Sequence, residues 1–172
     1  MSRLALGLDL GQSLGWSVFH GSELVAFGVR PLKRWQPVRA VQTLAGLVTA
    51  WSPDVVAIES VNFAVTVGAH AGHWRVRTLA ELALDQLEQL DRLVEIDATS
   101  LKRFATGRGN APKALVCAAA RARFGVDLWA RGELEEDHVS KAERGRQEDQ
   151  ADALFVGAWA ATAKDLRKAR RV

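Results

Sequence analysis

Four acidic residues are spaced along the chain so that a fold could bring them together. Asp9 and Glu59 each follow directly on a short apolar run, so two carboxylates stand at the ends of two strand-like segments. Asp149 and Asp152 are three residues apart, which on a helix puts both side chains on one face. Clustered carboxylates repel one another, and a hard divalent cation among them prefers oxygen ligands. The spacing therefore predicts a metal site, with Mg²⁺ as the expected ion.

Such a site suits the hydrolysis of a phosphodiester. That reaction needs an activated water and neutralised charge on the phosphate and the leaving oxygen, and two divalent ions about 3.5–4 Å apart supply both. Four carboxylates suit two ions. We therefore expect two Mg²⁺ ions in each active site, with Mn²⁺ as a substitute.

Each acid taken alone also has an ordinary structural explanation. Asp9, two residues before Gly11, can begin a turn. Asp149 and Asp152 in a first helical turn are favoured by the helix dipole. Glu59 is the strongest single indication, because a carboxylate directly after Val-Val-Ala-Ile loses its hydration unless it has a partner. It is the set of four that favours a metal site.

The charge is concentrated in one region. The whole chain has 23 Lys and Arg against 20 Asp and Glu, but residues 97–123 hold six basic residues against one acid. Such a stretch suits a polyanion. We expect Lys102, Arg103 and Arg108 to bind DNA, and Lys113 to stabilise the reacting phosphate or to hold a flanking one. Lys102 and Lys113 also fit ordinary solvated helix positions.

The segment after Glu59 supplies further candidates for DNA contact. Phe63 either stacks on bases near the cut or packs within its loop. Arg75 and Arg77 are expected to face DNA. His70 and His73 have a spacing that could bind a metal, but no neighbour completes a ligand set, so a surface pair is the favoured interpretation.

Hydrophobic periodicity predicts the elements that must position these residues. Alternating or continuous apolar runs separated by turn residues predict strands at 3–9, 14–20, 23–29, 55–59 and 93–96. Helical spacing predicts helices at 36–51, 73–89, 99–105 and 111–124. This order implies a mixed five-stranded α/β sheet, three antiparallel strands and then two parallel ones, with helices on both faces. Asp9 and Glu59 would then lie on neighbouring strands.

Length and composition fit one domain over residues 1–172. The segment from about 127 to 147 is charged and without a period, which predicts a mobile loop. A last helix is expected to begin near Glu148 and to lead into a basic tail at 164–172. The lone Cys117 excludes an internal disulfide. No apolar run reaches the roughly 18 residues of a membrane span and no signal peptide is seen, so we expect a cytoplasmic protein without membrane contact.

Several of these motifs resemble RuvC-type Holliday junction resolvases. The acidic motifs are Gly7–Val18, Ala57–Val61 and Asp149–Leu154, and they are similar to that family's opening strand, second acidic strand end and closing helix. Thr99–Lys102 and Gly107–Lys113 are similar to the family's basic positions beside the active site. The match spans almost the whole chain in the right order. The charged insert from about 127 to 147 and the stretch 62–72 depart from it.

The resemblance implies a ribonuclease H-like fold and a metal-dependent endonuclease. Its substrate would be a four-way DNA junction, cut by paired symmetric nicks in recombination and repair. Asp9 would bridge the two ions, Glu59 and Asp149 would help to hold one each, and Asp152 would complete the set. Paired nicks imply a homodimer. The apolar face of the helix at 73–89 is either its interface or part of the core.

Other functions share parts of the pattern. A different nuclease of the same fold, acting on branched DNA or on an RNA–DNA hybrid, would keep all four acids. A DNA-binding module without catalysis would need the basic stretch but not the acids. An actin-like ATPase or sugar kinase shares the opening Asp9–Gly11, but it binds nucleotide between two domains, for which 172 residues leave no room. The sequence does not indicate whether a branch-migration motor is a partner.

Overall fold

The computed structural model describes residues 2–10, 13–31, 37–60, 71–128, 141–164 and 166. Its strands are β1 (Leu4–Leu10), β2 (Ser13–His20), β3 (Glu23–Pro31), β4 (Val55–Ser60) and β5 (Leu93–Asp97). Its helices are α1 (Pro37–Trp51), α2 (Ala71–Asp85), the short 3₁₀ helix η1 (Leu90–Arg92), α3 (Ala98–Thr106), α4 (Lys113–Phe124) and α5 (Lys141–Thr162). No helix in these ranges is long and apolar enough to span a membrane.

The five strands form one mixed sheet in the order β3-β2-β1-β4-β5. The first three strands are antiparallel, and β1, β4 and β5 run parallel. The β2–β3 hairpin turns at Gly21, whose φ of 60° suits glycine. The predicted fold class is confirmed.

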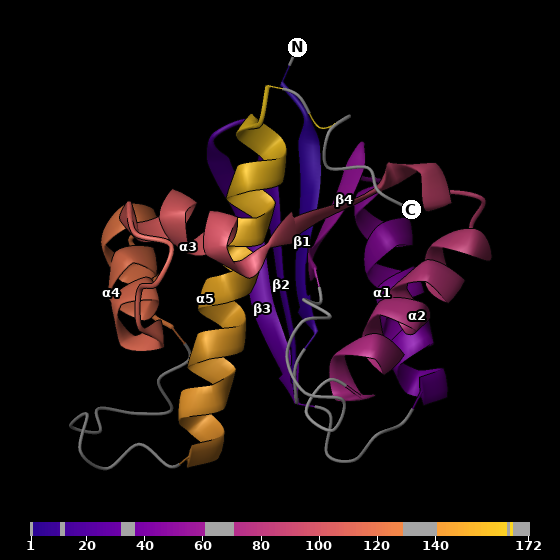
Figure 1. Ribbon diagram of the computed structural model, residues 1–172. Coiled ribbons are helices and arrows are strands. Elements are labelled where there is room, and N and C mark those ends of the chain that lie inside the picture. The colour runs from indigo at the N-terminus through magenta and orange to yellow at the C-terminus, as the bar shows by residue number, and fades with distance from the viewer. Residues whose placement is uncertain are drawn as a thin grey trace.

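Helices cover both faces of the sheet (Figure 1). On one face, α1 and α2 pack on the side chains of Leu6, Leu8 and Ile58. On the other face, α5 packs on the sheet, with α3 and α4 beside it. The alternate strand residues, such as Ala5 and Ala57, form a second core with α5. Strand side chains alternate between the two cores, as their period of two requires. At the carboxyl ends of β1 and β4, the residues that continue the series of Ala5 and Ala57 therefore face α5.

The packing of α5 on the sheet is unusually close. A Cβ atom built at Gly7 would lie 2.2 Å from the backbone nitrogen of Gly157, and one at Gly15 would lie 2.2 Å from the carbonyl oxygen of Asp149. Ser17 contributes a buried hydrogen bond, in which its hydroxyl donates to the carbonyl oxygen of Ala153 over 2.7 Å. Because glycine has no side chain, the backbone of α5 packs directly against strands β1 and β2 at these positions.

Two predicted boundaries are wrong. Helix α5 begins at Lys141, not near Glu148, so residues 141–147 are helical although they were predicted as part of a loop. Apart from Gly145 this stretch is made of ordinary helix formers, and a polar helix can form without an apolar period. Of the rest of the predicted loop, residues 129–140 lie outside the described residues, as do 165 and 167–172 of the predicted tail. Helix α2 ends at Asp85, four residues before its predicted end at Gln89.

Substituting Gly15 by Ala should destabilise the protein. The added Cβ would meet backbone, which cannot rotate away, so α5 would have to shift. Overpacking of this kind costs about 1–3 kcal/mol. Gly46→Ala is the matched control, because Gly46 lies in α1 with nothing within 4 Å of an added Cβ. That variant should gain about 0.5–1 kcal/mol. Urea unfolding followed by circular dichroism measures both, and a Gly15→Ala protein as stable as the wild type would contradict the close approach.

Candidate active site

The two strand-end acids lie at the same edge of the sheet. The β1–β4 ladder ends at the pair Leu8 and Ile58, and Asp9 and Glu59 are the next residue on each strand. Parallel strands bring their carboxyl ends to one edge, and the alternation turns these two side chains away from the core that holds Leu8. The prediction that Asp9 and Glu59 stand on neighbouring strands is confirmed, and both face α5.

Helix α5 brings the other two acids to that edge. The backbone N–H of Ser13, at the start of β2, donates to Asp149 Oδ2 over 3.2 Å. The side chain of Asp152 is only 13% exposed. Asp149 is fixed further by the close approach of its carbonyl group to Gly15. The helix therefore carries both carboxylates to the ends of β1 and β2.

Burial, and after it the charge of neighbouring acids, raises the pKa of each of the four acids. For Asp9 the pKa is raised well above its ordinary value by burial first and then by the charges of Asp152, Asp149 and Glu59. Burial followed by Asp152 raises the pKa of Glu59 to about 7. Burial raises the pKa of Asp149 to about 6, and it also raises that of Asp152. The charge of Asp152 raises the pKa of each of the other three acids, so the four carboxylates interact as one group.

Two lysines flank the acids. Lys113, the first residue of α4, places its Nζ 3.4 Å from Glu148 Oε2 and 3.7 Å from Asp152 Oδ2. Burial alone would lower the pKa of Lys113, but the charges of Asp152, Asp9 and Glu148 outweigh it and raise this pKa. On α3, Lys102 lies close enough for its charge to lower the pKa of both Glu59 and Asp152. Negative charge at the strand ends thus has positive charge on two sides.

The donor set fits a hard divalent cation in its chemistry, because every candidate ligand is a carboxylate. The arrangement of these carboxylates does not yet form a metal site. Among the described residues, no group of three or more His, Cys, Asp or Glu side chains is arranged to hold a metal ion. The acids interact through their charges, as the pKa shifts show. A cation would have to draw them closer.

Similarity to known proteins was found in three-dimensional structure. No protein-family model matches the chain, and neither does any curated protein sequence. Thermus thermophilus RuvC in complex with a Holliday junction substrate superposes with a TM-score of 0.67, at 17% identity, over 91% of this chain and 91% of that one. The chain has a RuvC-type resolvase fold.

Two further resolvases share this RuvC-type fold. The yeast mitochondrial Holliday junction resolvase matches with a TM-score of 0.59 and 18% identity, over 93% of this chain and 78% of that one. The fowlpox virus resolvase, in complex with Holliday junction DNA, matches with a TM-score of 0.52 and 13% identity, over 90% and 93% of the two chains. At these identities the likeness concerns the fold.

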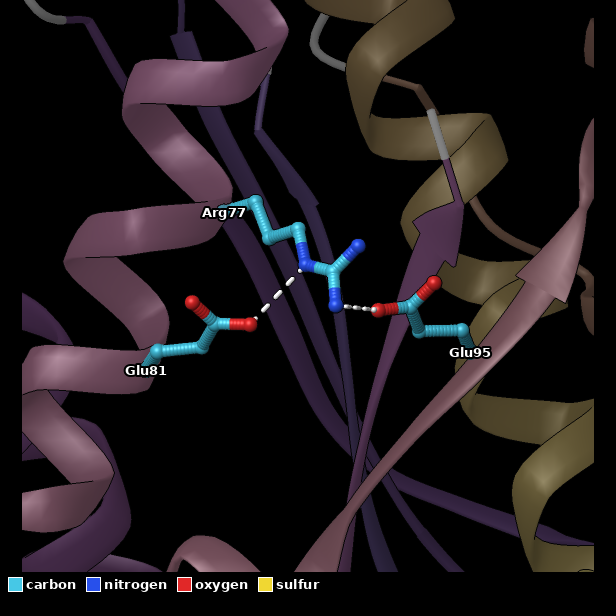
Figure 2. Close-up of polar contacts among 3 residues, drawn as sticks. All are labelled: Arg77, Glu81 and Glu95. Carbon is cyan, nitrogen blue, oxygen red and sulfur yellow. Dashed lines mark hydrogen bonds and ion pairs between the residues drawn. The ribbon is translucent and has the colours of Figure 1, made fainter. Parts of the chain in front are cut away.

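Arg77 does not join the site. Its Nε contacts Glu81 Oε1, one turn further along α2, and its Nη2 contacts Glu95 Oε1 on β5, both over 2.9 Å (Figure 2). The second contact is an ion pair by distance, although Glu95 Oε1 accepts no hydrogen bond. With its side chain 19% exposed between two carboxylates, Arg77 ties α2 to β5. Its position gives no support to the prediction that it binds DNA.

The remaining predicted DNA contacts divide into two groups. Arg103 on α3 and Arg108 after it are exposed, on the same side of the sheet as Lys102. Phe63 lies outside the described residues, and of Arg75 only the helical backbone is described. Their predicted contacts with DNA stay predictions.

Sequence reasoning missed two contributors to the site. Glu148 pairs with Lys113, and the Ser13 N–H binds Asp149. Glu148 stands four residues before Asp152, which indicates a shared helix face and could have been noticed. The Ser13 contact joins backbone and side chain across 136 positions of the chain, and no local pattern signals it.

Stability without divalent cations should fall as the pH rises from about 4.5 to about 7. Over this window the unfolded chain releases the Glu59 proton while the folded protein retains it, because the pKa of Glu59 rises from 4.5 to about 7 on folding. A carboxyl with a raised pKa binds more protons when folded, so its contribution falls by up to about 1.4 kcal/mol per pH unit.

Urea unfolding at several pH values checks this in the wild type and in Glu59→Gln. In Glu59→Gln the unfolding free energy should decrease less steeply with pH than in the wild type, and the variant should be the more stable protein near pH 7. The exposed Glu23 on β3 provides a matched control, since Glu23→Gln should keep the full slope. Parallel profiles for the wild type and Glu59→Gln would show that Glu59 is not held protonated.

Proposed function

We propose that the protein is a metal-dependent endonuclease that resolves four-way DNA junctions. One observation carries the proposal: the four carboxylates of Asp9, Glu59, Asp149 and Asp152 gather at one edge of the sheet, and the pKa of each is raised. Such crowding costs stability and suits a site that binds cations. A surface that only bound DNA would gain nothing from four partly buried acids near the phosphates.

The acids would hold two Mg²⁺ ions. Bound ions of this kind activate a water and neutralise charge on a scissile phosphate. Asp9 would take the bridging position, because it lies at the end of β1 beside Glu59 on β4 and faces α5, the helix that carries the other two acids. Asp149 is oriented by the Ser13 N–H and so presents its carboxylate in a fixed direction. Mn²⁺ would replace Mg²⁺, since it also accepts carboxylate ligands.

Lys113 would contact the phosphate that is cut. Its side chain is 53% exposed while its Nζ stays within 3.7 Å of Asp152, so the ammonium group faces both the acids and the solvent from which DNA arrives. A positive group there would stabilise negative charge that develops on the phosphate. Lys102, Arg103 and Arg108 would hold neighbouring phosphates and so position the strand.

A four-way junction is the favoured substrate. The Thermus thermophilus and fowlpox virus proteins of similar fold are in complexes with Holliday junction DNA. Paired symmetric nicks would require two active sites related by a two-fold axis, and hence a homodimer. The exposed Leu82 on α2 marks a candidate surface for it.

Asp152→Asn should abolish cutting of a four-way junction in Mg²⁺. The substitution removes a proposed metal ligand, and we expect a loss of more than about 100-fold, since even outer partners of metal ligands contribute 10- to 100-fold. Nicking of a synthetic junction, compared with linear duplex and with an RNA–DNA hybrid, is the measurement. Glu23→Gln should cut like the wild type, and a chelator should stop both.

Several results would count against the proposal. Normal cutting by folded Asp152→Asn would refute the site. Preference for the hybrid would replace the junction with another substrate of the same fold. Junction binding by the wild type without any cutting would indicate a DNA-binding module.

Asp9→Asn should still bind the junction in the absence of divalent cations. Removing an acid beside the phosphate reduces repulsion, so the affinity should be retained or increased. Electrophoretic mobility shift at several salt concentrations measures it, and the affinity of both proteins should fall steeply with salt. Loss of binding in the folded variant would mean that Asp9 contacts DNA by another route.

A further inference from the structure

Within the part of the chain that the structure describes, Glu148 is the one carboxylate in contact with Lys113 that the proposed metal site does not use. It stands one helical turn before Asp152 on α5, and the two side chains hold the Lys113 ammonium from adjacent positions, at 3.4 Å and 3.7 Å. The Glu148 side chain is 26% exposed and that of Asp152 is 13% exposed. Glu148 therefore lies on the outer side of the pair, nearer to solvent.

Lys113 needs such a partner. A lysine carries its charge on a flexible four-carbon stem and loses side-chain entropy when it is held in one place. The Lys113 backbone is fixed as the first residue of α4, but its side chain is 53% exposed. With Asp152 alone, the ammonium could rotate outward, or it could settle on an acid that the cations require.

We propose that Glu148 is a positioning residue, which holds the Lys113 ammonium at the rim of the acidic group, where it meets the phosphate to be cut. This inference rests on the proposed nuclease function. Glu148 acts through Lys113 and touches neither the phosphate nor the ions. The packing of α4 on α5 does not depend on it, because Val116, Ala120 and Phe155 share one core and Arg121 donates to Gln147 Oε1 over 3.3 Å.

The first experiment measures the order of the Lys113 side chain without DNA. In ¹³C-lysine-labelled protein at pH 7.5, the order parameter of the Lys113 Cε methylene, assigned with Lys113→Arg, should fall in Glu148→Gln. It should stay unchanged in Glu23→Gln, the control with the same chemical change on exposed β3. An unchanged order parameter in Glu148→Gln would overturn the proposal.

The second experiment is a double-mutant cycle on junction cutting in Mg²⁺. Glu148→Gln should lower kcat roughly fivefold, the size of effect expected for one partly exposed ion pair, and should leave KM nearly unchanged. In a Lys113→Gln background the same substitution should have no further effect, because the partner is gone. The unfolding free energy of Glu148→Gln should stay within about 1 kcal/mol of that of Glu23→Gln, the free-energy equivalent of the same fivefold effect.

The possible outcomes separate this proposal from the proposed function. If the wild type nicks no branched DNA, the nuclease function fails, whereas the Lys113 order parameter still decides whether Glu148 holds the lysine. If kcat falls equally with and without Lys113, Glu148 acts by another route and the positioning role is wrong. If KM changes and kcat does not, Glu148 influences binding and not the reacting phosphate.

Discussion

The close contact between α5 and the strands β1 and β2 is the constraint on which the site depends. Glycines at positions 7, 15 and 157 remove the side chains that would keep helix and sheet apart, and the Ser17 hydroxyl donates to the carbonyl oxygen of Ala153 in the space that remains. A Cβ at Gly15 would collide with the backbone of Asp149 itself. The packing that stabilises the second core thus also determines how near the helical acids come to the strand ends.

Electrostatics works against that packing. Burial raises the pKa of all four carboxylates at this edge, and the charges of neighbouring acids raise it further. Lys113 and Lys102 offset part of the repulsion, since each lowers the pKa of acids beside it. The remaining excess of negative charge is what would attract cations, and the half-exposed Lys113 leaves positive charge facing the solvent. Loss of stability at neutral pH and capacity to bind metal have the same origin.

Patterns of short range could be read from the sequence, and contacts of long range could not. Apolar runs ending in Asp9 and Glu59 indicated where two strands end. The order of strands and helices along the chain then predicted that these two strands are parallel neighbours. The start of α5 was placed seven residues late, since a polar helix lacks the apolar period by which a helix is recognised. Arg77 was predicted to face DNA, but its guanidinium contacts Glu81 and Glu95. Its partner Glu95 is 18 positions away on another element, so only the fold reveals that pairing.

The most direct test of the account is to locate metal in the protein. Crystals grown with Mn²⁺ should show two anomalous peaks about 3.5–4 Å apart at the edge of the sheet. Carboxylate oxygens of Asp9, Glu59, Asp149 and Asp152 should surround them, with Asp9 between the two. Crystals that bind no Mn²⁺ at these acids, or that bind it only elsewhere on the surface, would contradict the central claim.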